Sequence, residues 1–365
     1  MHSPLYPFLL AALYLVTGPN PVAAAGIQLV LGAGACGLMF LVGRRYVSAP
    51  AGAAAGLLEA FYGISVFHEG TLLTVLLIHL LNLGVLLTSA WALERNTWRR
   101  WLVPGLLLGL STLTRPNVVI WAVFLIAWMA LRAREQRRPL RAAAAPALAL
   151  LLMTAAAVAP ATIRNLVVLG EPMITVAQGG TNFYLGNARG ATGVHRPFGE
   201  LGLSASRQIR HFKAAAERRL GRTLTYGEAS RYWFGQALED IEQDPSRWWN
   251  LLMDKLLLFF NRYEYTGSIN PNAVREFTPV LRLPWLHFGI VGPLALLGLF
   301  FLWRRWRPLL PLFGLLAIYA FSNVALLVSS EYRYAIMPAA FVLAGAAGRE
   351  LFHRIRRRQW PELAL

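Results

Sequence analysis

Long apolar runs recur along most of this 365-residue chain, separated by short polar connections. A helix needs roughly 20 residues to cross the hydrocarbon core of a bilayer, and most of the runs approach that length. About nine such segments follow one another, at residues 22–42, 50–67, 71–93, 101–114, 118–132, 142–163, 285–303, 308–328 and 334–349. This pattern predicts an all-α polytopic membrane protein with about nine transmembrane helices.

The composition supports a membrane protein and argues against a nucleic-acid-binding one. Hydrophobic residues make up 56% of the chain, whereas soluble domains contain about 45–50%. A formal net charge of +17 would suggest nucleic acid if the charge were spread over a soluble surface. Here the basic residues gather in short clusters between apolar runs, so we expect no nucleic-acid partner.

Arginine clusters occupy every second connection between the apolar runs. The positive-inside rule places such clusters in the cytoplasm. Arginine-rich and arginine-poor connections alternate from one span to the next along the whole chain, as this rule requires. This assignment leaves the long segment 164–284 outside and the C-terminus inside. We therefore expect a multi-pass protein of the plasma (inner) membrane, with its large loop in the periplasm or extracellular space. The clusters are Arg44 and Arg45; Arg95, Arg99 and Arg100; Arg132, Arg134, Arg137, Arg138 and Arg141; Arg304, Arg305 and Arg307; and Arg349, Arg354, Arg356, Arg357 and Arg358.

The predicted spans divide the chain into four parts. Residues 1–163 form an N-terminal membrane region with six spans, 164–284 an external loop domain, 285–349 three further spans, and 350–365 a basic cytoplasmic tail. The first apolar run, Leu5 to Val16, is too short to be assigned with them. It is either a juxtamembrane helix on the outer surface or a first span entering from the cytoplasm. A signal peptide is less favoured, because the basic n-region is missing.

The external segment begins with a glycine-punctuated loop and continues with helices. Thr225 and Glu228 have the spacing of a capping box ahead of an amphipathic helix that runs through Asp240. After it, the stretch SRWWNLLMDKLLLFFNRYEY places its tryptophans and leucines at helical spacing. This stretch is either a helix at the outer membrane interface, where tryptophans gather, or a core helix of a small external domain.

Arg115 is an isolated cation between two short apolar runs, in the sequence Arg115-Pro116-Asn117. The runs are so short that we expect this turn to be drawn below the outer surface. A guanidinium stays protonated and carries five donors in a fork that suits phosphate oxygens, so an anionic lipid headgroup is its natural partner. The alternative is a snorkelling arginine that satisfies carbonyl groups at a helix end.

Glu69 is a second unusual charge, next to His68 at the outer turn between two spans. A carboxylate there suits proton abstraction or a divalent cation such as Mg²⁺ or Mn²⁺, with His68 as a weaker second ligand. Neighbouring side chains on a helix diverge, which weakens the pair as a metal site. Motifs for nucleotide binding (Walker loop, dinucleotide glycine fingerprint), HExxH and GxSxG are absent, so no nucleotide cofactor is expected.

Several stretches together resemble the GT-C membrane glycosyltransferases of the family 39 type, relatives of the protein O-mannosyltransferases and of the lipid A aminoarabinose transferase. Each stretch is loose alone, but their order, spacing and predicted side of the membrane agree over nearly the whole chain. They are HSPLYPFLLAALYLVTG, FYGISVFHEGTLL, GLSTLTRPN, APATIRN, GGTNFYLGNARGATG, DKLLLFFNRYE and EYRYAIMP.

The resemblance implies transfer of a sugar from a polyprenyl-phosphate donor to a lipid, glycan or protein acceptor on the outer face. Glu69 matches an acidic residue that the family places near the donor phosphate and, in some members, near a metal. Arg115 matches the basic residue that holds the lipid phosphate, a role that Arg164 and Arg333 share at the same outer level. The glycine-rich loop then supplies residues that line the sugar or acceptor site: Asn182, Tyr184 and Asn187.

The chain departs from the family pattern at its beginning. Family members carry a first span and an acidic external loop, which supplies the presumed catalytic base, before the HSPLYP-like segment. Here the sequence starts at that segment, so we expect either a true start upstream of Met1 or a protein without its base. Two other classes stay open: a non-catalytic subunit that binds lipid-linked glycans, and a flippase or transporter for them.

Overall fold

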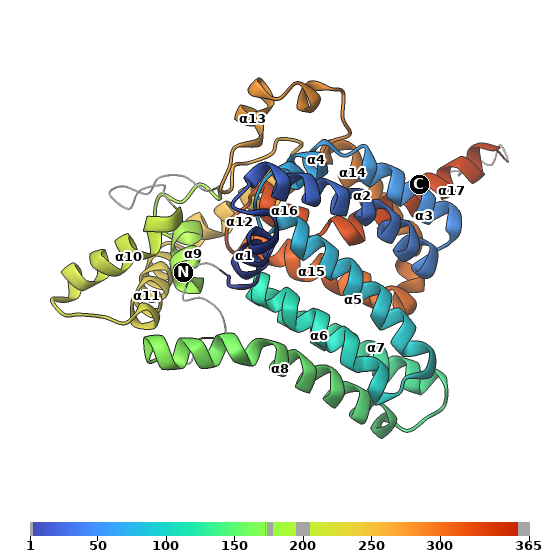
Figure 1. Cartoon of the computed structure of the whole chain (residues 1–365), viewed down its shortest axis with the longest axis horizontal. Coiled ribbons are helices and arrows are strands. Elements are labelled where there is room, and N and C mark those ends of the chain that lie inside the picture. The colour runs from blue at the N-terminus through green and yellow to red at the C-terminus, as the bar shows by residue number, and fades with distance from the viewer. Residues whose placement is uncertain (1–2, 172, 174–177, 195–204, 357–365) are drawn as a thin grey trace.

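The computed structural model describes residues 3–171, 173, 178–194 and 205–356 (Figure 1). Helices make up 82% of the structure, and the described residues contain no strand, which confirms an all-α polytopic membrane protein. The N-terminal region consists of α1 (Leu5–Thr17), α2 (Pro21–Tyr46), α3 (Ala49–Ala60), α4 (Gly63–Gly70), α5 (Val75–Arg95), α6 (Trp98–Thr114), η1 (Pro116–Ile120), α7 (Trp121–Glu135), η2 (Leu140–Ala143) and α8 (Ala144–Leu169).

The remaining helices form the external segment and the C-terminal membrane region. The external segment contains α9 (Gly179–Asn187), α10 (Ala205–Leu220), α11 (Tyr226–Gln243), α12 (Pro245–Phe260), α13 (Pro271–Phe277) and η4 (Pro279–Arg282). The C-terminal region contains α14 (Phe288–Leu302), η5 (Trp303–Arg305), α15 (Trp306–Ala325), α16 (Ser330–Tyr334) and α17 (Met337–Arg356).

All nine predicted apolar segments are mainly helical, with 50–67 divided between α3 and α4, but the number of spans is not fixed by the structure. Among the described residues, five stretches are long and apolar enough to cross a membrane, and the last of them joins α14 and α15. The count of nine therefore stays a prediction, as do the four-part division and the orientation. At 13 residues, α1 reaches about 20 Å, which is short of a bilayer core of about 30 Å. The five stretches are Pro21–Tyr46, Val75–Arg95, Pro116–Glu135, Leu140–Val168 and Phe288–Ala325.

Polar side chains cap the N-termini of several helices, where the first backbone N–H groups have no acceptor within the helix. The predicted capping box is confirmed, because the Thr225 hydroxyl accepts from the Glu228 amide and the Glu228 carboxylate accepts from the Thr225 amide. Asn20 caps α2 and Asp244 caps α12, each followed by a proline at the first helical position. Local sequence thus fixes where these helices begin.

The main hydrophobic core lies within the membrane helices, around α17. This helix packs between α3 and α14 (Figure 1), and its residues 337–347 are all buried. Glycines permit the close approach: a Cβ at Gly298 would lie 1.9 Å from the Leu343 carbonyl oxygen, and one at Gly345 would lie 2.4 Å from the Ala51 carbonyl oxygen. Backbone-to-backbone contact of this kind is typical of helices packed in lipid.

A second, smaller core holds the external helices together. It joins α9, α10 and α11 through rings such as Tyr184, Phe212 and Trp233. None of its residues comes from α12, whereas Phe259 of α12 belongs to the main membrane core. The exposed face of α12 carries Trp249 and Leu257, which favours the interpretation as a helix at the membrane interface.

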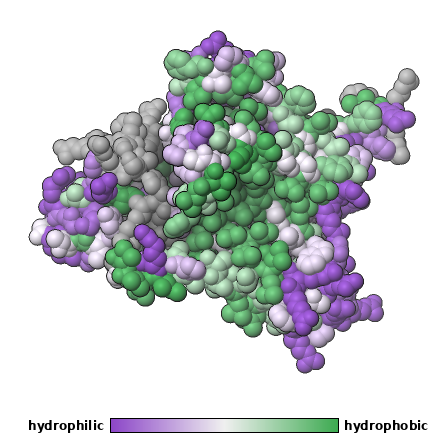
Figure 2. All heavy atoms as spheres, viewed as in Figure 1, coloured by the Kyte–Doolittle hydropathy of each residue, from purple (hydrophilic) through white to green (hydrophobic). Residues whose placement is uncertain are grey.

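Hydrophobic and hydrophilic residues separate clearly on the surface. Figure 2 shows apolar side chains gathered over the helical bundle and hydrophilic ones over α10 and α11. Other hydrophilic residues gather where α7 connects to α8, which is one of the arginine-rich connections. The surface therefore has the banded pattern of a protein that sits across a bilayer.

Replacing Gly298 by alanine should loosen the α14–α17 packing. The new methyl group cannot be accommodated without moving backbone, so we expect a loss of about 1–3 kcal/mol and a melting temperature lower by several degrees. The matched control is Gly37→Ala in α2, where an added Cβ meets nothing within 4 Å. Thermal unfolding of both purified variants checks the prediction, and equal melting temperatures would contradict it.

Candidate functional site

A polar cavity of about 360 Å³ lies where the ends of the membrane helices meet the external segment. The membrane helices contribute Arg115 at the end of α6 and residues of α15, and the external segment contributes α9. Such a cavity can take a ligand with one part in the membrane and one part outside it. Its lining is Ser3, Thr74, Thr114, Arg115, Pro116, Asn117, Gln178, Gly179, Asn182, Ser268, Tyr319, Ser322, Asn323, Leu326, Glu331 and Tyr332.

Arg115 supplies the cation of this cavity. One Nη atom donates to the Glu331 carbonyl oxygen at 3.1 Å, and the guanidinium lies 4.3 Å from the centre of the Tyr332 ring. The buried Nε has no hydrogen-bond partner among the described residues. Arg115 is therefore held in position by a carbonyl and a ring rather than neutralised by a carboxylate, which leaves its charge available to an anion.

The proline after Arg115 explains why the guanidinium stands at the cavity. A residue that precedes proline is disfavoured in helical conformation, and Arg115 adopts φ −143° and ψ 110°. The helix α6 therefore ends at Thr114, and Pro116 begins the short helix η1. The predicted turn below the outer surface thus has a local cause in the sequence.

The floor of the cavity is polar although it lies among membrane helices. Asn117 donates to the Ser322 hydroxyl at 2.8 Å. The Asn323 Oδ1 is buried without a hydrogen-bond partner in the described part of the chain, and the buried Tyr319 hydroxyl lies near the side chain of Asn82. Because buried polar atoms without partners are costly, these groups favour an occupant with hydroxyl groups or ordered water.

The external wall of the cavity is the start of α9, with Asn182 and Gly179. This helix is fixed against α11: the Gly180 amide donates to the Ser230 hydroxyl at 3.0 Å, and a Cβ at Gly180 would lie 1.8 Å from the Ser230 carbonyl oxygen. The glycine pair at 179–180 thus allows α9 to pack closely against α11, and this packing brings Asn182 to the cavity. The predicted role of Asn182, lining a sugar or acceptor site, requires such a position.

Glu331 is the carboxylate of the cavity lining, and sequence reasoning missed it. The residue is 9% exposed. Its carboxylate accepts hydrogen bonds from the amide and the hydroxyl of Ser268. A Cβ at Gly267 would lie 2.6 Å from the carboxylate carbon, so the loop needs glycine there. The sequence did contain a sign of it, because Glu331 lies two residues before Arg333 in the stretch EYRYAIMP, which carries part of the family resemblance.

Arg333 lies elsewhere, in a fully occupied structural position. It is 2% exposed, forms an ion pair with Glu264 at 2.7 Å, and donates to the carbonyl oxygens of Phe259, Asn261 and Tyr263. It does not line the cavity. A guanidinium that is surrounded in this way joins the external segment to α16, and a phosphate role for it has no geometric support.

Glu69 and His68 lie on α4, beside the cavity rather than in its lining. The Glu69 side chain packs against α2, where a Cβ at Gly32 would meet its carboxyl carbon at 2.1 Å. Burial, and then the nearby carboxylate of Glu59, raise the pKa of Glu69 to about 7. Burial, with smaller effects of Arg115 and His79, lowers the pKa of His68 to about 3.

A buried acid–base pair next to this region was also missed from the sequence. Glu59 of α3 and His79 of α5 lie 2.5 Å apart, and neither side chain is exposed. The Tyr334 ring stands 5.0 Å from both His68 and His79. An ionisable residue inside an apolar run is itself a signal of a special role, and both Glu59 and His79 lie inside predicted spans.

The other predicted residues lie outside the cavity lining. Arg164 is exposed near the end of α8 and donates to its neighbour Asn165. Tyr184 packs in the external core against Trp233. Asn187 is buried and uses both ends of its amide in hydrogen bonds to the surrounding protein. Their roles at the sugar or phosphate stay predictions without geometric support.

The described residues bring no full set of ligands for a divalent cation together. No group of three His, Cys, Asp or Glu side chains comes together among the described residues. His68 has two buried ring nitrogens without hydrogen-bond partners, but a single imidazole is too few ligands for a stable site. The mechanism proposed below therefore uses no metal, and the predicted metal role of Glu69 and His68 stays untested.

The N-terminal membrane region matches a known protein family. Residues 1–163 match the family model "Dolichyl-phosphate-mannose-protein mannosyltransferase". The match covers slightly less than half of the chain, and it confirms the predicted resemblance to GT-C enzymes of the protein mannosyltransferase type. A comparison with curated protein sequences gives no match.

Solved structures of an archaeal oligosaccharyltransferase share the fold. The Archaeoglobus fulgidus enzyme AglB, in complex with an inhibitory peptide and a dolichol-phosphate, is 15% identical with a TM-score of 0.54. The apo form from the same organism is 14% identical with a TM-score of 0.55. Each alignment covers 98% of this chain and 43% of the other, so this chain spans less than half the length of those enzymes. Together the comparisons show that this chain shares its fold with these enzymes and that residues 1–163 resemble GT-C enzymes of the protein mannosyltransferase type.

The raised pKa of Glu69 predicts how stability depends on pH. Because its pKa is about 7 in the folded protein against an ordinary 4.5, the folded state binds the extra proton and loses stability as pH rises through this window. Glu69→Gln should therefore gain about 1–2 kcal/mol at pH 8, the shift being discounted for partial exposure, and almost nothing at pH 5.

Melting temperatures of wild type and variant at the two pH values check this prediction. The exposed Glu276→Gln is the matched control and should show no such difference. A Glu69→Gln variant that is equally stabilised at pH 5 and pH 8 would contradict the proposed titration.

Proposed function

We propose that this protein transfers a sugar from a polyprenyl-phosphate donor to an acceptor at the arginine-poor face of the membrane. The observation that carries the proposal is the Arg115 guanidinium, which lines a polar cavity between the bundle and the external segment and has no carboxylate partner among the described ion pairs. A lipid-linked donor needs this arrangement, since its phosphate lies at the membrane surface while its sugar lies outside.

Arg115 is proposed to bind the donor phosphate and to stabilise it as it leaves. Charge develops on the phosphate oxygens when the bond to the sugar breaks, and a cation fixed beforehand stabilises that charge without having to reorient. The contacts with the Glu331 carbonyl oxygen and the Tyr332 ring supply this fixation. Arg115 is thus the residue on which the chemistry most depends.

The nature of the donor is supported by the relatives. The family model that matches residues 1–163 is named for enzymes that use dolichyl-phosphate-mannose, and AglB was solved with a dolichol-phosphate. Both names contain a polyprenyl phosphate. Asn182 faces the cavity from the external segment and offers an amide to sugar hydroxyls, and the polar floor with Tyr319 and Asn323 offers further hydrogen bonds within the cavity.

Glu331 is proposed as the group that accepts the proton of the attacking acceptor hydroxyl. It is the carboxylate among the described residues that line the cavity, and hydrogen bonds from Ser268 hold it in place. The nucleophile then forms its bond to the sugar carbon while the bond to the phosphate oxygen breaks, and the proton passes to the carboxylate. Glu69, predicted as catalytic from the sequence, is the second candidate because its pKa of about 7 suits a general base.

Arg115→Ala should lower transfer by about 100-fold or more, because a fixed donor to developing charge is worth roughly that factor. Membranes that contain the variant would be assayed with radiolabelled sugars linked to polyprenyl phosphate, mannose first. The matched control is Arg275→Ala, an exposed arginine on α13 outside the cavity, which should keep full transfer. Normal turnover by Arg115→Ala would remove the assignment.

Glu331→Gln and Glu69→Gln separate the two candidate bases. We expect Glu331→Gln to lose kcat by about 100-fold or more with little change in donor affinity, because general base catalysis contributes factors of this size. Glu69→Gln should then keep most of its activity. The reverse result would move the base to Glu69. Donor binding without transfer, in the wild type and in a version extended upstream of Met1, would favour a non-catalytic binding subunit.

A further inference from the structure

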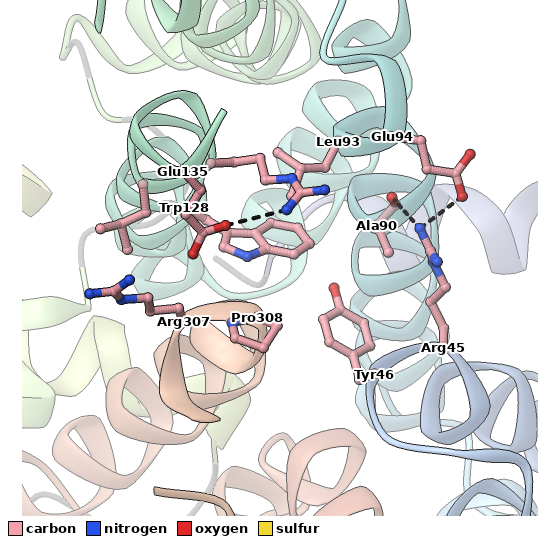
Figure 3. Close-up of a pocket in the computed structure, with 11 residues that line it drawn as sticks. Arg45, Tyr46, Ala90, Leu93, Glu94, Trp128, Glu135, Arg307 and Pro308 are labelled. Atoms are coloured by element: carbon pink, nitrogen blue, oxygen red, sulfur yellow. Dashed lines mark hydrogen bonds and ion pairs between the residues drawn. The ribbon is translucent and has the colours of Figure 1, made fainter. Parts of the chain in front are cut away.

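A second pocket lies at the arginine-rich end of the bundle, far from the Arg115 cavity. It has a volume of about 230 Å³ and is formed by the ends of α2, α5, α7 and α15 (Figure 3). Arg100, near its entrance, lies in the first turn of α6, the helix that ends just before Arg115, and the 17 residues of α6 span about 25 Å. The lining is Arg45, Tyr46, Ala90, Leu93, Glu94, Trp128, Leu131, Arg132, Glu135, Arg307 and Pro308.

The charges of the pocket are unbalanced in favour of an anion. Arg45 pairs with Glu94 at 2.7 Å, and Arg132 pairs with Glu135 at 3.3 Å. Both pairs are about half-exposed, so water weakens them. Arg307 has no ion pair within the described part of the chain. The lining therefore holds three arginines and two glutamates, which leaves one net positive charge at the edge of the pocket.

Aromatic rings make the wall of the pocket. Tyr46 and Trp128 are stacked with their ring centres 6.0 Å apart, and the Tyr46 hydroxyl donates to the Leu86 carbonyl oxygen. Figure 3 shows Arg307 and Arg45 at opposite ends of the space, with the Trp128 and Tyr46 rings between them. The pocket thus combines an apolar wall with charged groups at its rim, which suits an amphipathic ligand.

Exposed tryptophans place this end of the bundle at the membrane surface. Four of them are each paired with an arginine whose guanidinium lies 4.4–5.9 Å from the ring centre. Tryptophans at 41–57% exposure, in pairs with arginine, are typical of the depth at which lipid headgroups lie. The pairs are Trp91 with Arg100, Trp98 with Arg99, Trp303 with Arg304, and Trp306 with Arg307.

We propose that this pocket binds the phosphate of an anionic phospholipid headgroup, with Arg307 as the unpaired cation and the Tyr46–Trp128 wall beside the glycerol. The site is separate from the proposed transfer reaction and goes beyond it. Basic pockets between transmembrane helices recognise anionic lipid headgroups in this way. A soluble phosphate offers the same charge, but it cannot use the apolar wall or the headgroup depth of the pocket.

Lipid binding by single variants tests the proposal. The purified full-length chain is titrated in detergent with phosphatidylglycerol, and bound lipid is counted by native mass spectrometry, with phosphatidylcholine as the neutral reference. Arg307→Gln should weaken phosphatidylglycerol binding roughly fivefold, since one basic residue near an anionic surface contributes about that factor. Glu135→Gln should strengthen binding, because it frees Arg132 from its carboxylate.

The matched control is Arg304→Gln, which removes the same charge from the turn before α15 but does not line the pocket. It should leave binding unchanged. Equal losses in Arg304→Gln and Arg307→Gln, or no gain in Glu135→Gln, would overturn the site. Displacement of the lipid by millimolar inorganic phosphate would assign the pocket to a soluble phosphate and overturn the lipid proposal.

Discussion

The ion pair between Arg333 and Glu264 is the contact on which the arrangement of the cavity depends. It is buried, 2.7 Å long, and surrounded by carbonyl oxygens from the end of α12 and the segment that follows it. An isolated charge at this depth would be too costly, so each partner requires the other. The pair fixes the external segment on α16, and α16 carries the Glu331 carbonyl oxygen that holds Arg115. Arg333 thus helps to set the geometry of the cavity although it does not line the cavity itself.

A charge among apolar helices is costly unless it has a partner or binds a ligand. This constraint divides the ionisable residues of the protein into two groups. Glu59 and His79 satisfy each other within the bundle, and Arg333 is satisfied by Glu264. Arg115 and Arg307 are the two cations at cavities that have no ion pair among the described residues. They lie at opposite ends of the bundle, which suits two phosphate-bearing ligands with different roles: a lipid-linked donor at one end and a structural lipid at the other.

Much of the fold follows directly from the sequence. The nine apolar runs are mainly helical, and the capping box at Thr225 and Glu228 formed as its spacing predicts. The end of α6 at Arg115 follows from Pro116. Arg115 and Asn182 were predicted and do line one cavity. These features depend on hydropathy, on proline and on polar caps, which act over a few residues and are therefore visible along the chain.

Other parts of the site were decided only when distant segments met. Arg115 and Arg333 look alike in the sequence, each an isolated arginine at the outer level. One reaches a cavity and the other is enclosed by Glu264 and three carbonyl oxygens. Glu331 entered the site because Ser268, Gly267 and α15 surround it. The sequence by itself determined the membrane class, the helices and the presence of isolated charges. The tertiary structure decided which charges are paired, because the partners come from distant segments, as Arg333 and Glu264 do.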